Sequence, residues 1–173
     1  MRFDLDFMFG RNRNKGFTLI EFLIYMGLFS ILLVVTFQMF SSIFSVQLES
    51  ESTSSVDSDG KYIMQRFTYD MNRASSITTP ATQGTSSATL TLVVNSQNLT
   101  YSLNGNNLQL QNTTAGTTDQ LNSTDTTVSN LSFIRLDGGG KDVVQMNFTL
   151  KSVVIREGNR HEVTNYSTSA GLR

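Results

Sequence analysis

The 173-residue chain has no cysteine, no tryptophan, one proline and one histidine. Without cysteine there is no disulfide framework, no thiolate metal site and no cysteine nucleophile. A single histidine cannot build a metal site of several histidines. Basic residues are also too few for a broad nucleic-acid surface, because 13 Lys and Arg stand against 14 Asp and Glu. We therefore expect no cofactor, no metal and no specific nucleic-acid site.

One long uncharged run dominates the first third of the chain. No charged residue occurs among the 27 residues from Phe22 to Leu48. As a helix this run would be about 40 Å long, and about 20 such residues cross the hydrocarbon core of a bilayer. A buried core helix would need more surrounding protein than the rest of the chain supplies. The run therefore predicts one membrane-spanning helix.

The charges on either side of this run predict its orientation. Arg11, Arg13 and Lys15 precede it, and four acidic residues follow it within 49–59. Basic residues stay on the cytoplasmic side, so we expect the amino terminus inside the cytoplasmic membrane and the bulk of the chain outside. An ordinary secretory signal has a shorter apolar region that ends at small residues. Cleavage behind this run is therefore not expected.

Glu21 does not fit a plain membrane anchor. It lies at the start of the apolar stretch with no Lys or Arg at helical spacing after it. A lone carboxylate at membrane depth costs a few kcal/mol or more. Either Glu21 reaches the headgroups or it has a function, and the residue alone leaves both interpretations open.

The segment Lys15–Ile24 reads KGFTLIEFLI and, together with the basic leader, closely resembles the class III signal of type IV pilins and pseudopilins. In that family a membrane peptidase cuts after the glycine, on the cytoplasmic side, and the new first residue is N-methylated. The resemblance implies that leader 1–16 is removed between Gly16 and Phe17 and that Phe17 is methylated. It also implies that Glu21 pairs with the α-amine of a neighbouring subunit and sets the axial register of a filament.

The same resemblance implies partners. These are the prepilin peptidase, other pilin or pseudopilin subunits, the inner-membrane assembly platform, and the lipid bilayer before assembly. Secreted cargo, a surface or DNA are further candidate partners of the outer part. Type II secretion systems, type IV pili and DNA-uptake systems use the same N-terminal segment, so the resemblance does not identify which of these machines the chain serves. The filament would lie at the cell surface or in the periplasm.

The remaining residues predict an α+β fold, and the resemblance implies that this fold is pilin-like. Apolar residues at helical spacing in 61–77 extend the apolar segment into one spine helix over 17–77, of which 17–48 is membrane-embedded and Gly60 is the one candidate break. Beyond it, 78–173 forms a small antiparallel β domain packed on the rear of the helix. Its expected elements are strands at 88–94, 128–136, 144–150 and 161–168, a hairpin turning at Asn104-Gly105 and a long loop over 111–127.

A weaker resemblance concerns the subtype. Tyr62, Arg66, Asp70 and 73–77, with the C-terminal 166–173, are similar to J-type minor pseudopilins of type II secretion and to PilW-like minor pilins. The outermost tip subunit of secretion systems usually lacks the acid at the position of Glu21. The presence of Glu21 therefore argues against a position at the tip.

Other motifs are less informative. Asp57–Gly60 is similar to the start of a calcium loop, but the later acids of that pattern are absent, so we interpret these acids as leading into a helix. His161 has no G-x-S-x-G elbow to support a hydrolase. The leading hypothesis is a structural subunit and not an enzyme. The alternatives are a permanently anchored extracytoplasmic binding protein or adhesin that does not polymerise and, with little support, a membrane-tethered hydrolase.

Overall fold

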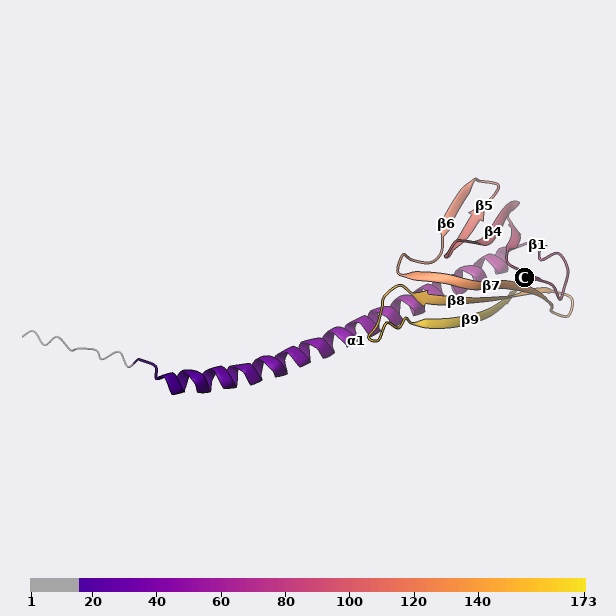
Figure 1. Cartoon of the computed structure of the whole chain (residues 1–173). Helices are drawn as coiled ribbons and strands as arrows, with labels where there is room; N and C mark the ends of the chain where they lie inside the picture. Colours follow the sequence, from indigo (N-terminus) through magenta and orange to yellow (C-terminus); the bar gives the residue numbers. More distant parts are fainter. Residues whose placement is uncertain (1–15) are drawn as a thin grey trace, which may run out of the picture. The chain divides into compact units, whose positions relative to one another are not determined.

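The computed structural model describes residues 16–173 (Figure 1). The predicted roles of Arg11, Arg13 and Lys15 lie outside these residues. A single helix, α1 (Leu19–Arg73), comes first and nine strands follow it. The chain divides into two compact units, Met1–Ile43 and Phe44–Arg173.

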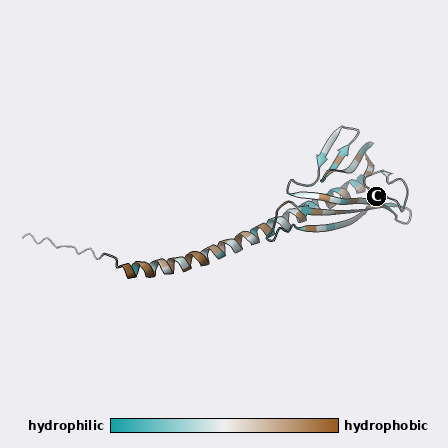
Figure 2. Ribbon diagram, in the orientation of Figure 1, coloured by the Kyte–Doolittle hydropathy of each residue, from teal (hydrophilic) through white to brown (hydrophobic). Residues whose placement is uncertain are grey.

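In the first unit the described part of α1 is apolar and uncovered. Every residue from Gly16 to Ile43 is exposed except Glu21, which is half-buried, and Figure 2 shows this stretch as largely hydrophobic. The hydroxyls of Ser30 and Thr36 donate to main-chain carbonyls four residues earlier, at 2.7 and 2.8 Å. These two hydroxyls therefore need no water, which suits a helix in lipid.

In the second unit α1 buries one narrow stripe. The buried residues recur every three or four positions, so that they share one face of the helix: they are Ser52, Val56, Gly60, Ile63, Phe67, Asp70 and Met71. This face packs against the β domain.

The β domain consists of two antiparallel sheets. The five-stranded sheet has the order β1-β3-β4-β5-β6, and the four-stranded sheet has the order β2-β7-β8-β9. The bounds of the first sheet are β1 (Ser76–Thr79), β3 (Leu90–Val94), β4 (Gln97–Asn104), β5 (Asn107–Asn112) and β6 (Thr117–Gln120). Those of the second are β2 (Ser86–Ser87), β7 (Thr126–Asp137), β8 (Asp142–Ser152) and β9 (Val163–Gly171). The predicted α+β class is confirmed.

The core joins the helix to both sheets. Phe67 of α1, Tyr101 of β4 and Phe133 of β7 are fully buried, and their ring centroids lie 6.2 to 6.4 Å apart. Burying a side chain of this size contributes about 1.5–3 kcal/mol. These three rings therefore pack α1 and the two sheets against one another.

Gly60 does not interrupt the helix. A Cβ at this position would lie 2.3 Å from Cζ of Tyr166, whose hydroxyl donates to the Val56 carbonyl at 3.1 Å. The glycine lets β9 approach the helix closely, and this packing offsets its low helix propensity of about 1 kcal/mol. The candidate break near Gly60 is therefore absent.

The helix ends at Arg73, four residues before the predicted end at Ile77. Ser75 N donates to Val93 O at 2.8 Å, and Ser76–Thr79 form β1, which pairs with β3. Ile77, Thr78 and Thr79 are β-branched and favour a strand. Pairing with β3 therefore overrides the helical spacing of the apolar residues.

The strand predictions are confirmed in type, with one error. Asn104 pairs with Asn107 across the predicted turn, where Gly105 has φ of 61°. The loop expected over 111–127 is wrong in part, because Thr117–Gln120 return as β6 and pair with β5. Thr and Asn also favour turns, so composition alone did not distinguish this short strand from a loop.

Candidate processing and assembly segment

A side-chain cap by Thr18 fixes the start of α1. Thr18 Oγ1 accepts a hydrogen bond from Glu21 N at 3.3 Å, and Thr18 O accepts the first helical bond from Phe22 N at 3.1 Å. Thr followed three residues later by Glu is the sequence signature of such a cap. Thr18 lies within the signal motif, and its spacing from Glu21 would by itself have predicted the cap.

The predicted cleavage bond lies just outside the helix. Gly16 and Phe17 are both exposed and precede the first helical residue, and nothing lies within 4 Å of the position of a Gly16 Cβ. The Phe17 ring is 72% exposed and meets the Tyr25 ring edge-on, with centroids 5.6 Å apart. A peptidase could therefore reach this bond without unwinding the Thr18 cap.

Glu21 sits in the first turn of α1, where the helix dipole favours negative charge. The Tyr25 hydroxyl lies 3.5 Å from Glu21 Oε1, a long contact on the same helix. Among residues 16–173 no Lys or Arg forms an ion pair with this carboxylate.

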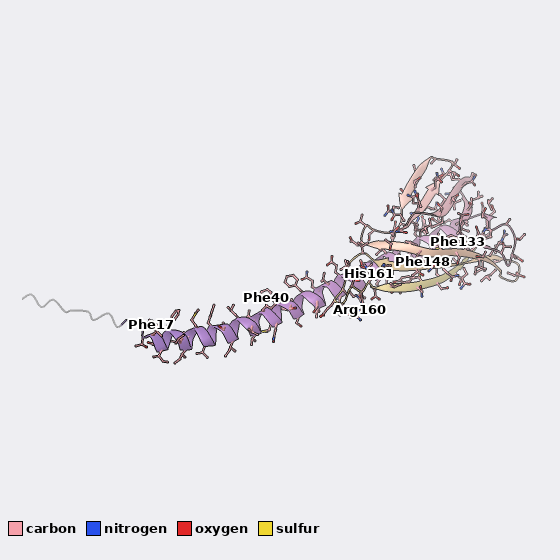
Figure 3. All side chains as sticks on the ribbon, in the orientation of Figure 1. Phe17, Phe40, Phe133, Phe148, Arg160 and His161 are labelled. Carbon is pink, nitrogen blue, oxygen red and sulfur yellow. The ribbon has the colours of Figure 1, made fainter. Side chains whose placement is uncertain are left out.

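The apolar length of α1 is sufficient for a membrane. It is the one described helix long and apolar enough to cross a bilayer, and none of its most apolar window is buried. Phe17 and Phe40, which Figure 3 labels on this part of the helix, are both mostly exposed. These features suggest anchoring by a single helix.

The acids of Asp57–Gly60 lie inside the unbroken helix, so the expectation that they lead into a helix is wrong. Asp57 pairs with Lys61 at 2.6 Å on the surface. Asp59 accepts hydrogen bonds from Ser123 N and Ser123 Oγ, both at 2.8 Å, and from Thr126 Oγ1. It thus holds the chain before β7 against α1. Within residues 16–173 no group of three His, Asp or Glu residues could hold a metal ion.

Asp70 belongs to a buried polar cluster. Its Oδ2 accepts from Arg66 Nε at 2.9 Å and from the Tyr101 hydroxyl at 2.7 Å, and its side chain is only 1% exposed. Burial, reinforced by the adjacent Asp70 carboxylate, raises the pKa of Tyr101 above its usual range. Of the other subtype positions, Tyr62 is exposed and Arg73 lies over the Tyr69 ring, 4.9 Å from its centroid. This cluster joins β4 to the helix.

His161 has a structural contact. Its Nδ1 donates to Ser152 O at 2.9 Å and so helps to close the turn between β8 and β9, where Figure 3 labels it beside Arg160. In the same turn Arg156 binds Glu162 and donates to Thr53 Oγ1 of α1 at 3.0 Å. These contacts support the fold and give no specific support to a hydrolase.

Comparison with known families matches residues 11–37 to the prokaryotic N-terminal methylation motif. No curated protein and no solved structure gave a significant match. The matched motif is the class III signal and indicates a precursor of the type IV pilin or pseudopilin kind. It suggests a structural subunit rather than an enzyme, and it implies processing by a prepilin peptidase.

Proposed function

We propose that the chain is the precursor of a minor pilin or pseudopilin of a type II secretion pseudopilus or a type IV pilus, cleaved after Gly16 and N-methylated at Phe17. The observation that carries the proposal is the methylation motif over residues 11–37. The exposed bond before the Thr18 cap supports it, because cleavage there leaves the helix start intact. The domain organisation is then leader 1–16, spine helix and outer β domain.

Assembly proceeds through the helix in this proposal. The α-amine of Phe17 in one subunit pairs with Glu21 of its neighbour, and the apolar face that lipid covered becomes the packing surface between helices. The leader keeps the Phe17 nitrogen in an amide, so it blocks this pairing until cleavage. The basic leader and the acids after residue 48 support an orientation with the β domain outside the cytoplasmic membrane.

The decisive experiment determines the intact mass and N-terminal residue of the protein purified from membranes of its native host. The expected product begins at N-methyl-Phe17. A chain that still begins at Met1, in cells whose peptidase processes other substrates, would overturn the proposal and favour the permanently anchored binding protein.

The register role of Glu21 has its own test, which compares Glu21→Gln with Glu51→Gln on the same helix. Removing one partner of a buried ion pair costs about 3–5 kcal/mol, more than a hundredfold in an association constant. We expect Glu21→Gln to leave the filament fraction and stay in the membrane, and Glu51→Gln, which is exposed, to assemble as the native chain does. Equal assembly of both variants would refute the pairing.

A further inference from the structure

The turn between β8 and β9 concentrates the exposed apolar surface of the β domain. Val153 and Ile155 of this turn are each 52% exposed, and Val163, the first residue of β9, is 54% exposed. No other large apolar side chain of the described residues after Arg73 is more than 37% exposed. Single apolar residues scattered over a surface are ordinary, whereas apolar residues gathered in one place mark a contact.

This turn is held in place by main-chain hydrogen bonds. Arg156 N donates to Arg160 O at 2.7 Å across the turn, and the two residues form an isolated β-bridge. Val153 N donates to Asp125 O at 2.8 Å, in the chain that leads into β7. The exposure of Val153 and Ile155 therefore belongs to an ordered turn.

The turn is fastened to α1 where the uncharged run ends (Figure 1). Arg156 donates to Thr53 Oγ1 at 3.0 Å, and its other terminal nitrogen lies 3.9 Å from Glu49 Oε1. Glu49 is the first charged residue after the run, which ends at Leu48. Thr53 is five residues beyond Leu48, about 7.5 Å along the helix axis. All of these residues belong to the unit Phe44–Arg173.

The end of the uncharged run sets the level of the bilayer surface. Phe44 and Val46 are 60% and 63% exposed, so they need an apolar medium, whereas the Glu49 carboxylate needs water or headgroups. A bilayer is about 40–45 Å thick around a hydrocarbon core of about 30 Å, so each headgroup layer is about 5–7.5 Å deep. The turn that Arg156 holds beside Thr53 is therefore at the level of the headgroups.

The charges of the turn nearly cancel. Residues 151–163 contain three basic and two acidic side chains, and Arg156 is paired with Glu162. Attraction to anionic lipid needs a cluster of basic residues, which this turn does not have. Its apolar side chains, and not its charge, are what suit it to a bilayer.

We propose that the turn between β8 and β9 lies in the boundary between headgroups and acyl chains of the bilayer that α1 spans before assembly, with Val153, Ile155 and Val163 in contact with lipid. This inference rests on the proposed function, which places α1 in the cytoplasmic membrane. The occupant is a phospholipid surface, because the chain's own apolar segment brings that surface to within a few residues of the turn. Apolar burial at this depth stabilises peripheral contacts with membranes.

The test uses the absence of cysteine, since one introduced cysteine carries a fluorophore at a single known place. Ile155→Cys of the purified full-length chain is labelled and reconstituted, one chain per disc, into phosphatidylcholine nanodiscs with and without bromine on the acyl chains. Bromine quenches only a fluorophore that comes close to it. The matched control is Leu136→Cys, because Leu136 pairs with Val143 at the other end of β8, about 30 Å along the strand from the turn.

We expect bromine to remove at least half of the fluorescence at Ile155→Cys and less than a tenth at Leu136→Cys. These discs contain no other protein and no second copy, so a turn that binds only a protein partner would give no quenching. Equal quenching at the two positions, or none at Ile155→Cys, would overturn the proposal.

A second variant tests whether the apolar side chains hold the turn in lipid. Val153→Ser and Ile155→Ser together, with the label at Val163→Cys, should lower the quenching at least twofold, whereas Leu103→Ser should leave it unchanged. All of these side chains are exposed, so we expect circular dichroism to show folded variants. Undiminished quenching in the double variant would refute the apolar contact.

A label at Phe40→Cys distinguishes the failure of this inference from the failure of the proposed function. Phe40 lies in the uncharged run and is 59% exposed, so its label should be quenched if α1 enters the bilayer. Quenching at Phe40→Cys without quenching at Ile155→Cys would refute the contact of the turn alone. Absence of quenching at both would refute the membrane anchoring on which the proposed function also depends.

Discussion

The two parts of α1 use apolar residues in opposite ways. From Leu19 to Ile43 the helix is almost continuously apolar and buries none of its described residues, whereas from Phe44 to Arg73 it is far more polar and buries seven. Burial therefore follows the spacing of apolar residues and not their number. Apolar residues at every third or fourth position predict a helix that packs against its own chain. A helix that is apolar on all sides is predicted to lie in another apolar medium.

The acids of the helix show the same contrast. Asp70 lies in the covered part, where Arg66 and Tyr101 satisfy it. Glu21 lies in the uncovered part, where its one described side-chain contact is Tyr25 at 3.5 Å. This chain's own fold supplies the partners of Asp70. In the proposed function, another subunit supplies the partner of Glu21.

The largest expected effect comes from one phenylalanine in each part. Phe67→Ala removes a fully buried ring and should lower the free energy of unfolding by about 3–5 kcal/mol. Phe40→Ala removes a ring that is 59% exposed and should change it by less than about 0.5 kcal/mol. Denaturant unfolding of the full-length chain in detergent, followed by the near-ultraviolet signal of tyrosine, measures both. Similar losses of unfolding free energy in the two variants would contradict the division of α1 into an uncovered part and a part that packs on the β domain.

A smaller effect distinguishes two neighbouring aspartates. Asp59→Ala removes the acceptor that holds Ser123 and Thr126, and hydrogen bonds to a charged group contribute about 1.5–3 kcal/mol. Asp57→Ala breaks only an exposed pair with Lys61, worth at most about 0.5 kcal/mol. The same unfolding measurement compares the two. An equal loss would show that Asp59 does not fasten the chain before β7.

The smallest effect is a dependence on alkaline pH. The raised pKa of Tyr101, caused by its burial and by Asp70, means that the folded chain keeps this proton when the unfolded chain loses it above about pH 10. This contribution to stability is complete below pH 10 and is lost as the pH rises further, by up to about 1.4 kcal/mol per pH unit.

Unfolding between pH 9 and 11 tests this loss, with Tyr101→Phe as the comparison. The variant has no phenol at this position, so its stability should fall less steeply with pH. Tyr166, whose pKa is also raised by burial, accounts for part of the slope that remains. Identical slopes in the two proteins would contradict the role of Tyr101.

Features that depend on neighbouring residues were predictable from the sequence. The apolar run, the acid at Glu21, the Asn104-Gly105 turn and the alternating strands all appear where local patterns indicated. Each depends on residues a few positions apart, whose geometry is set by helix or strand periodicity. The Thr18 cap belongs to the same group, because the spacing between Thr18 and Glu21 is visible in the sequence.

Features that depend on distant partners were not predictable. The helix stops at Arg73 because Ser75 and β1 pair with β3, and Asp59 acquires its role from residues 123 and 126. Tyr101 reaches Asp70 across 31 positions. Periodicity carries no information about which distant segment lies opposite, so the division into two sheets and these polar contacts needed the structure.

The sequence separation between Val56 and Tyr166 determines how long part of α1 lacks its packing partner during synthesis. The two residues are 110 positions apart, and ribosomes add about 5–20 residues per second. The stripe of Val56, Ile63 and Phe67 is therefore made roughly 5–20 seconds before β9, which comes to lie beside it. During that interval a nascent chain presents bare apolar surface next to a segment bound for lipid. Prompt delivery to the membrane, or a chaperone that holds this stretch, would limit the time in which it can aggregate.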